Sequence, residues 1–123
     1  MFLQDSITNV ATFVQRAALA AITGPQDSVD EKLACLQRKR DAMVGGLNSI
    51  AGIRCPTPSG SDVSKTGMTA EEFTRRLLHE RQVAVVSGTA FGSQGEGFVR
   101  LTFAVPDEDI EAGLEGIASM LRN

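Results

Sequence analysis

The sequence predicts an α+β domain in which a short, mostly antiparallel sheet packs against helices. Its 123 residues correspond to one domain, and its 42% hydrophobic and 22% charged residues are typical of a protein with a buried core. Apolar residues recur with helical spacing toward both ends of the chain. Between them lie two stretches with the β-branched composition of strands, at residues 82–86 and 98–104.

Charge, hydropathy and cysteine spacing argue against several classes of partner. Twelve basic and fifteen acidic residues give a net charge of −3, which provides no broad positive field for nucleic acid or an anionic membrane. The longest apolar run, residues 17–22, is far shorter than the roughly 18 residues of a membrane span, and no signal-peptide pattern is present. Cys35 and Cys55 are isolated, so we expect reduced thiols and no metal site. We therefore expect no nucleic-acid or membrane partner and a cytoplasmic location.

The first two helices are expected on either side of a glycine-proline break. The first covers residues 6–22, and its small apolar side chains favour close packing until Gly24 and Pro25 end it. The second begins at Ser28, whose hydroxyl is expected to cap the first turn while Glu31 returns the bond. Its core stripe comprises Val29, Leu33, Leu36, Met43, Leu47 and Ile50.

Two adjacent glycines, Gly45 and Gly46, stand near the end of this second helix. Glycine costs about 1 kcal/mol relative to alanine within a helix. The pair therefore indicates either a close contact or a local weakening of the last turns, and the sequence leaves both alternatives open.

The third helix has the clearest local signature. Thr69 and Glu72 form a T-x-x-E capping box, and Met68 and Phe73 are spaced for a hydrophobic staple. The lone histidine, His79, falls near the helix end, where we expect a surface position. The residues expected to face the core are Phe73, Leu77 and Leu78.

The final helix is expected to start at Pro106, which suits a first helical turn. Three acidic residues follow directly and complement the positive end of the helix dipole. Its apolar stripe comprises Ile110, Leu114, Ile117 and Leu121.

Residues 98–104 place a cation in the middle of a strand. Alternation puts Arg100 on one face, and the other face is apolar throughout. The preceding residues 87–97 are rich in glycine, but their spacing does not match phosphate-binding loops, which favours a flexible turn. A strand arginine is usually solvated or ion-paired, whereas beside a concave loop its guanidinium suits a carboxylate or a phosphate. Arg100 shares its face with Phe98, Thr102 and Ala104, and the apolar face comprises Val99, Leu101 and Phe103.

Four segments, in their order and spacing, carry a resemblance to a known family. They read TFVQRAALAAITGPQDSV, DAMVGGLNSIAGIRC, GMTAEEFTRRLLHERQVAVVSGTAFGSQGEGFVRLTFA and PDEDIEAGLEGI. Over essentially the whole chain they resemble the C-terminal part of pyridoxal-phosphate-dependent aminotransferases of the aspartate aminotransferase class (class I/II). The resemblance implies amino-group transfer between an amino acid and a 2-oxo acid. It also implies that residues 1–24 lead from a large domain into a small domain at residues 25–123.

The resemblance assigns substrate-binding roles to Arg100 and Phe91, and it gives Lys65 no catalytic role. It implies that Arg100 binds the α-carboxylate of the substrate and that Phe91 lines the substrate pocket. The family's cofactor-holding segments and Schiff-base lysine are not among the matching residues. Lys65 follows a serine as the family lysine does, but the sequence after it identifies a small-domain loop. We therefore expect this chain to hold no pyridoxal phosphate and to be inactive by itself.

One strand of the family has no counterpart in this sequence, because Gly60 runs directly into Ser61 and Asp62. We expect its loss to leave the strand from Phe98 to Ala104 with an unsatisfied edge, which favours self-association. Two hypotheses follow. The chain is a truncated or excised small domain of an aminotransferase, or it is a stand-alone self-associating or small-ligand-binding α+β module.

Overall fold

The computed structural model of the protein describes residues 10–57 and 61–122. Contacts between Cα atoms separate the chain into two compact units, residues 1–33 and 34–123. The predicted domain boundary at residues 24–25 stays a prediction. Within the described ranges, no helix is both long and apolar enough to cross a membrane.

The first unit contains α2 (Thr12–Thr23) and the beginning of α3 (Asp27–Asn48). The N–H of Gly24 donates to the carbonyl of Ala20 at 2.9 Å, so the predicted end of the first helix is confirmed. Part of its predicted start, residues 6–9, lies outside the described residues. None of the side chains of α2 is buried.

The start of α3 differs from the predicted capping box. The N–H groups of Val29 and Asp30 donate to the carbonyl of Gln26 at 2.8 and 3.2 Å, so the helix begins before Ser28. The side-chain amide of Gln26 also donates to the carbonyls of Ala21 and Gly24. Because Gln26 fixes this corner, Ser28 lies inside the first turn and the predicted cap at Ser28 is wrong.

The second unit confirms the α+β prediction. After the remainder of α3 it contains, in order, β1 (Ser61–Asp62), the 3-10 helix η1 (Ser64–Thr66), α4 (Ala70–Arg81), β2 (Val86–Ser87), the 3-10 helices η2 (Gly88–Phe91) and η3 (Ser93–Gly95), β3 (Phe98–Arg100) and α5 (Asp107–Arg122). The three strands form an antiparallel sheet in the order β1-β3-β2.

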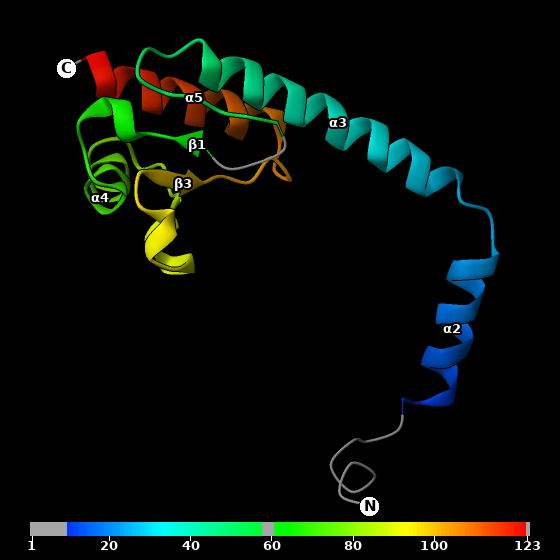
Figure 1. Cartoon of the computed structure of the whole chain (residues 1–123). Coiled ribbons are helices and arrows are strands. Elements are labelled where there is room, and N and C mark those ends of the chain that lie inside the picture. Colours follow the sequence, from blue (N-terminus) through cyan, green and yellow to red (C-terminus); the bar gives the residue numbers. More distant parts are fainter. Residues whose placement is uncertain (1–9, 58–60, 123) are drawn as a thin grey trace, which may run out of the picture. The chain divides into compact units, whose positions relative to one another are not determined.

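Helices cover one face of this sheet. Val99 of β3 points into the core with 2% of its surface exposed, whereas Phe98 and Arg100 on the opposite face are exposed. Figure 1 shows α5 running alongside the part of α3 that belongs to this unit. The largest fully buried side chains come from the helices and from the segment after β1: Leu47, Phe73, Leu77, Ile117, Met120 and Val63.

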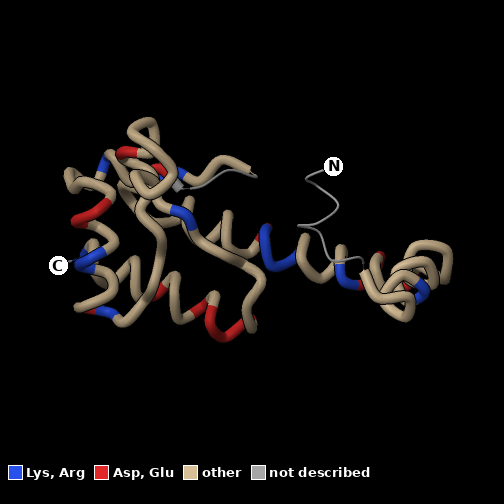
Figure 2. Tube along the Cα trace, turned by 90° about the horizontal axis from the view of Figure 1, so that it is seen from below, with Lys and Arg blue, Asp and Glu red and all other residues tan. Residues whose placement is uncertain are grey.

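The contact between α3 and α5 explains one of the two glycines. A Cβ at Gly46 would collide with the methyl groups of Leu114, whereas a Cβ at Gly45 would meet no atom within 4 Å. At Gly46, the close-contact alternative is therefore the correct one. Lys39 of α3 adds polar contacts at the start of α5, because its Nζ lies 3.4 Å from Asp107 Oδ1 and donates to the carbonyl of Val105, which precedes the helix. Figure 2 shows the acidic stretch in which Asp107 lies, at the start of α5.

The local predictions for α4 are mostly confirmed. Thr69 Oγ1 accepts a hydrogen bond from the N–H of Glu72 at 3.1 Å, which confirms the first of the two bonds of the predicted capping box. Phe73 and Leu77 are completely buried. Leu78 is 47% exposed, so its predicted core position is wrong, because the core-facing stripe of this helix is narrower than the sequence indicates.

The structure corrects the edge predicted for the strand from Phe98 to Ala104. Only Phe98–Arg100 forms a strand. Val99 is paired on both sides, Phe98 is paired with β1 and Arg100 is paired with β2. The residues directly after Gly60 pair with β3 there, in the register Ser61 to Val99. The predicted unsatisfied edge is therefore wrong at Val99, which has partners on both sides. Self-association itself stays a prediction.

Candidate functional site

Arg100 lies at the end of β3, on the face of the sheet that the helices leave uncovered. Because Val99 fills the core, strand alternation directs Arg100 outward, and Val86 of β2 is its partner in the register. Val86 and Phe98 are 44% and 43% exposed, so both neighbours on this face are apolar and partly open to solvent. The predicted division of the strand into an apolar face and a cation-bearing face is confirmed for these residues.

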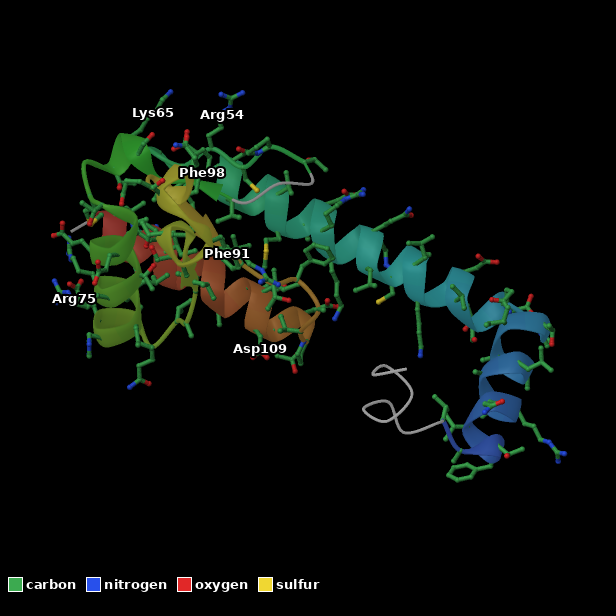
Figure 3. The ribbon with its side chains drawn as sticks, turned by 60° about the horizontal axis from the view of Figure 1, so that its bottom comes forward. Arg54, Lys65, Arg75, Phe91, Phe98 and Asp109 are labelled. Atoms are coloured by element: carbon green, nitrogen blue, oxygen red, sulfur yellow. The ribbon has the colours of Figure 1, made fainter. Side chains whose placement is uncertain are left out.

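Phe91 is brought to Arg100 from η2. The Cζ atom of Arg100 lies 5.5 Å from the centre of the Phe91 ring, within the range of a cation–π contact. Phe91 is 63% exposed, so its ring is accessible beside the cation. Figure 3 shows Phe91 and Phe98 on the same part of the second unit. The two residues predicted from the sequence are therefore in contact, although nine positions separate them in the chain.

Glycines hold the loop of residues 88–97 in place. A Cβ at Gly88 would lie 2.7 Å from the carbonyl oxygen of Phe98 and would collide with the carbonyl oxygen of Gly95. A Cβ at Gly95 would collide with the backbone of Gly88 in return. The two 3-10 helices, η2 and η3, therefore pack backbone to backbone, and this packing carries Phe91 over β3. The loop therefore consists of two consecutive 3-10 turns, and its predicted flexibility stays a prediction.

A carboxylate that sequence reasoning missed fixes the end of this loop. Glu96 Oε1 accepts hydrogen bonds from the N–H of Gly97 at 3.0 Å and from the N–H of Ala70 at 2.8 Å. Ala70 is the first residue of α4, whose free N–H groups and dipole favour a negative charge. This contact spans 26 positions of sequence, so no local motif indicates it.

The Arg100 guanidinium is not neutralised within the described part of the chain. The ion pairs there involve other residues, and no side-chain carboxylate hydrogen-bonds to Arg100. A planar guanidinium with free N–H groups can bind a carboxylate through two parallel hydrogen bonds.

A second carboxylate on this face is already satisfied locally. Asp62 stands opposite Phe98 in the register and forms an isolated bridge with Arg54. Its Oδ1 accepts hydrogen bonds from Ser64 Oγ at 2.6 Å and from Ser64 N at 2.9 Å. These bonds lower the pKa of the Asp62 carboxyl below its ordinary value, and the positive charges of Lys65 and Arg54 act in the same direction. Asp62 is therefore ionised at neutral pH and engaged with Ser64.

The described residues do not fit the pyridoxal phosphate that the resemblance implies for the family. A Schiff-base lysine requires an enclosed amine that is free to react. Lys39 donates to the carbonyl of Val105, and Lys32 is exposed on α3. Lys65 is exposed on η1, and Figure 3 shows it projecting away from Phe91. None of these three lysines, the only ones in the sequence, offers such an amine.

Comparison with known proteins places this arrangement in one family. Residues 3–117 match the family model described as aminotransferase class I and II. The chain is 36% identical to the aspartate aminotransferase of Musicola paradisiaca (strain Ech703), covering 96% of this chain and 31% of that protein. It is also 36% identical to an LL-diaminopimelate aminotransferase of Dehalococcoides mccartyi, covering 96% of this chain and 31% of that protein.

A solved structure gives the same result. The crystal structure of the aspartate aminotransferase from Rhizobium meliloti matches with a TM-score of 0.89 and 30% sequence identity, over 97% of this chain and 33% of that chain. The chain therefore spans about a third of the length of the relatives it matches.

Proposed function

Because this chain belongs to the class I and II aminotransferases, we propose that it forms the small domain of such an enzyme and that Arg100 binds the α-carboxylate of an amino-acid or 2-oxo-acid substrate. The contact between Arg100 and Phe91 carries the proposal, because it joins an unpaired guanidinium to an accessible aromatic ring on an uncovered sheet face. Phe91 packs beside the carbon chain of the bound acid.

The role of Arg100 is to position the substrate. Two parallel hydrogen bonds fix both the location and the plane of the carboxylate, which sets the direction of the bonds at the adjacent α-carbon. Lysine at this position would keep the positive charge and lose the planar pair of donors. In the family, pyridoxal phosphate supplies the electron sink for the chemical step. We propose that this chain binds the substrate carboxylate through Arg100 and does not transfer amino groups by itself.

An NMR titration of the chain with L-aspartate tests the binding role. We expect saturable shifts of the Arg100 side-chain N–H and of the Phe91 ring at millimolar ligand. Arg100→Ala should abolish the shift of the Phe91 ring, and Arg100→Lys should weaken binding about tenfold, the equivalent of about 1.4 kcal/mol. Arg75→Ala is the matched control, because Arg75 is an exposed cation on α4 that forms none of the ion pairs of the described residues.

Two results would contradict the proposal. Titration shifts that persist unchanged in Arg100→Ala would place carboxylate binding elsewhere. Turnover of an amino donor by the purified chain with added pyridoxal phosphate would disprove its inactivity.

A further inference from the structure

An open groove runs between α3 and α5 on the second unit, and we call it the α3–α5 groove. Its volume of about 580 Å³ is within the range of small-ligand sites. One wall is the end of α3 with the residues directly after it, and the other is one face of α5, which Figure 1 shows alongside α3. Neither Arg100 nor Phe91 lines the groove, so it is separate from the candidate site described above.

The floor of the groove is apolar and continuous with the core. Ile50, Leu114 and Leu121 pack against the core but are only partly buried, so each keeps apolar surface open to solvent. Burial of this surface favours a ligand that has an apolar chain. The apolar residues that line the groove are Ile50, Ala51, Leu114, Ala118 and Leu121.

The charged side chains of the groove leave one carboxylate available. Arg122 and Glu115 pair with each other at 2.6 Å. Glu111, the remaining charged residue of the lining, takes part in none of the ion pairs that the described residues form. Two carboxylates and one guanidinium give the groove an excess of one negative charge, which is complementary to a ligand with a single positive charge.

Two cations of α3 border the same carboxylate without pairing with it. Arg38 and Lys39 line a smaller hollow that also includes Glu111. Lys39 is engaged by Asp107, and none of the ion pairs within the described ranges joins Arg38 to Glu111. Glu111 is therefore accessible to a cation that enters from the groove.

We propose that the α3–α5 groove binds a small primary aliphatic amine as its ammonium ion. The ammonium group lies at Glu111, and the alkyl chain follows Leu114, Ala118 and Leu121. These four residues share one face of α5, because they are separated by three, four and three positions. From the first to the last of them the helix rises about 15 Å, at about 1.5 Å per residue, which accommodates an extended chain.

An alkylammonium ion matches both features of the groove at once. Its chain buries the apolar floor, and its charge pairs with the Glu111 carboxylate. A fatty acid of the same length would bring a like charge to Glu111, and an alcohol would leave this carboxylate without a counter-charge. The groove therefore discriminates among ligands of equal chain length by the charge of the head group.

The test is a titration of the full chain with n-octylammonium chloride, followed by NMR of the methyl groups of Leu114 and Leu121. We expect saturable shifts at millimolar ligand. n-Butylammonium should bind at least about tenfold more weakly, because it buries fewer methylene groups. 1-Octanol should bind about two- to fivefold more weakly because it forms no ion pair, and octanoate should bind more weakly still.

Charge variants change the affinity in opposite directions. Glu111→Gln should weaken n-octylammonium binding by about two- to fivefold, because it removes the exposed ion pair. Arg122→Ala should strengthen binding by a similar factor, because it removes the positive charge of the groove and frees Glu115. Glu108→Gln is the matched control, since it makes the same change at an exposed residue of α5 that does not line the groove, and it should leave the affinity unchanged.

Three results would overturn the proposal. One is an equal effect of Glu111→Gln and Glu108→Gln, and another is octanoate binding as tight as that of n-octylammonium. The third is a dimer in sedimentation velocity that Ala118→Phe dissolves, since a second copy would then occupy the groove. The titration is repeated in Arg100→Ala, where unchanged amine binding is expected, so failure of the Arg100 proposal leaves this result unaffected.

Discussion

Removal of the Glu96 carboxylate should loosen the loop that carries Phe91. Glu96 Oε1 accepts two backbone hydrogen bonds, from Ala70 at 2.8 Å and from Gly97 at 3.0 Å. Each such bond contributes about 1 kcal/mol, and a charge at a helix N-terminus contributes about 0.3–1 kcal/mol more. Because Glu96 is exposed to water, we expect Glu96→Ala to lower the free energy of unfolding by about 2 kcal/mol, at the lower end of that sum.

The appropriate assay is urea unfolding of the variant combined with amide hydrogen exchange. Exchange at Ala70 and Gly97 should accelerate in Glu96→Ala, because both N–H groups lose their acceptor. The NMR contact between Phe91 and Arg100 should weaken in the same variant. Glu96→Gln keeps an acceptor oxygen without the charge and should cost about half as much.

Glu71→Ala separates the hydrogen bonds from the helix dipole. Glu71 lies in the same first turn of α4, but it accepts no hydrogen bond from another described residue. We expect it to cost less than about 1 kcal/mol and to leave exchange at Ala70 unchanged. If Glu71→Ala and Glu96→Ala destabilise the protein equally, or if exchange at Ala70 does not change in Glu96→Ala, the proposed anchoring of the loop is refuted.

Two further predictions concern α3 and β1. Gly45→Ala should stabilise the protein by up to about 1 kcal/mol through its higher helix propensity. Gly46→Ala gains the same propensity, but its Cβ would displace the Leu114 methyl groups, so this variant should be about 1–3 kcal/mol less stable than Gly45→Ala; equal denaturant midpoints would contradict this assignment. The lowered pKa of Asp62 contributes stability that is present above the ordinary aspartate pKa and is lost as the pH falls through the lowered value. Ser64→Ala removes the hydrogen bond from Ser64 Oγ to Asp62 Oδ1, which helps to lower this pKa. In urea unfolding, the variant should therefore lose less stability than the parent protein between about pH 6 and pH 3. An unchanged loss would show that other groups cause the pH dependence.

The sequence by itself determined the features that depend on neighbours along the chain. Thr69 and Glu72 are three residues apart, so the cap of α4 follows from local geometry. Alternation with a period of two placed Val99 inside and Arg100 outside. The resemblance selected Arg100 and Phe91 separately, because the order and spacing of the matching segments specify the family, and the contact between the two is seen only in the structure.

Tertiary structure decided the features that depend on residues distant in sequence. Gly45 and Gly46 are indistinguishable in the sequence, and only the approach of Leu114 from α5 separates their roles. Val99 has partners on both sides because β1 pairs beside it, which the expected loss of a strand did not predict. Glu96 anchors the loop by accepting a hydrogen bond from the N–H of Ala70. No local sequence pattern predicts this bond, because the two residues are 26 positions apart. A side chain's partner across the fold is fixed by packing of the whole domain, and the chain's periodicity carries no information about it.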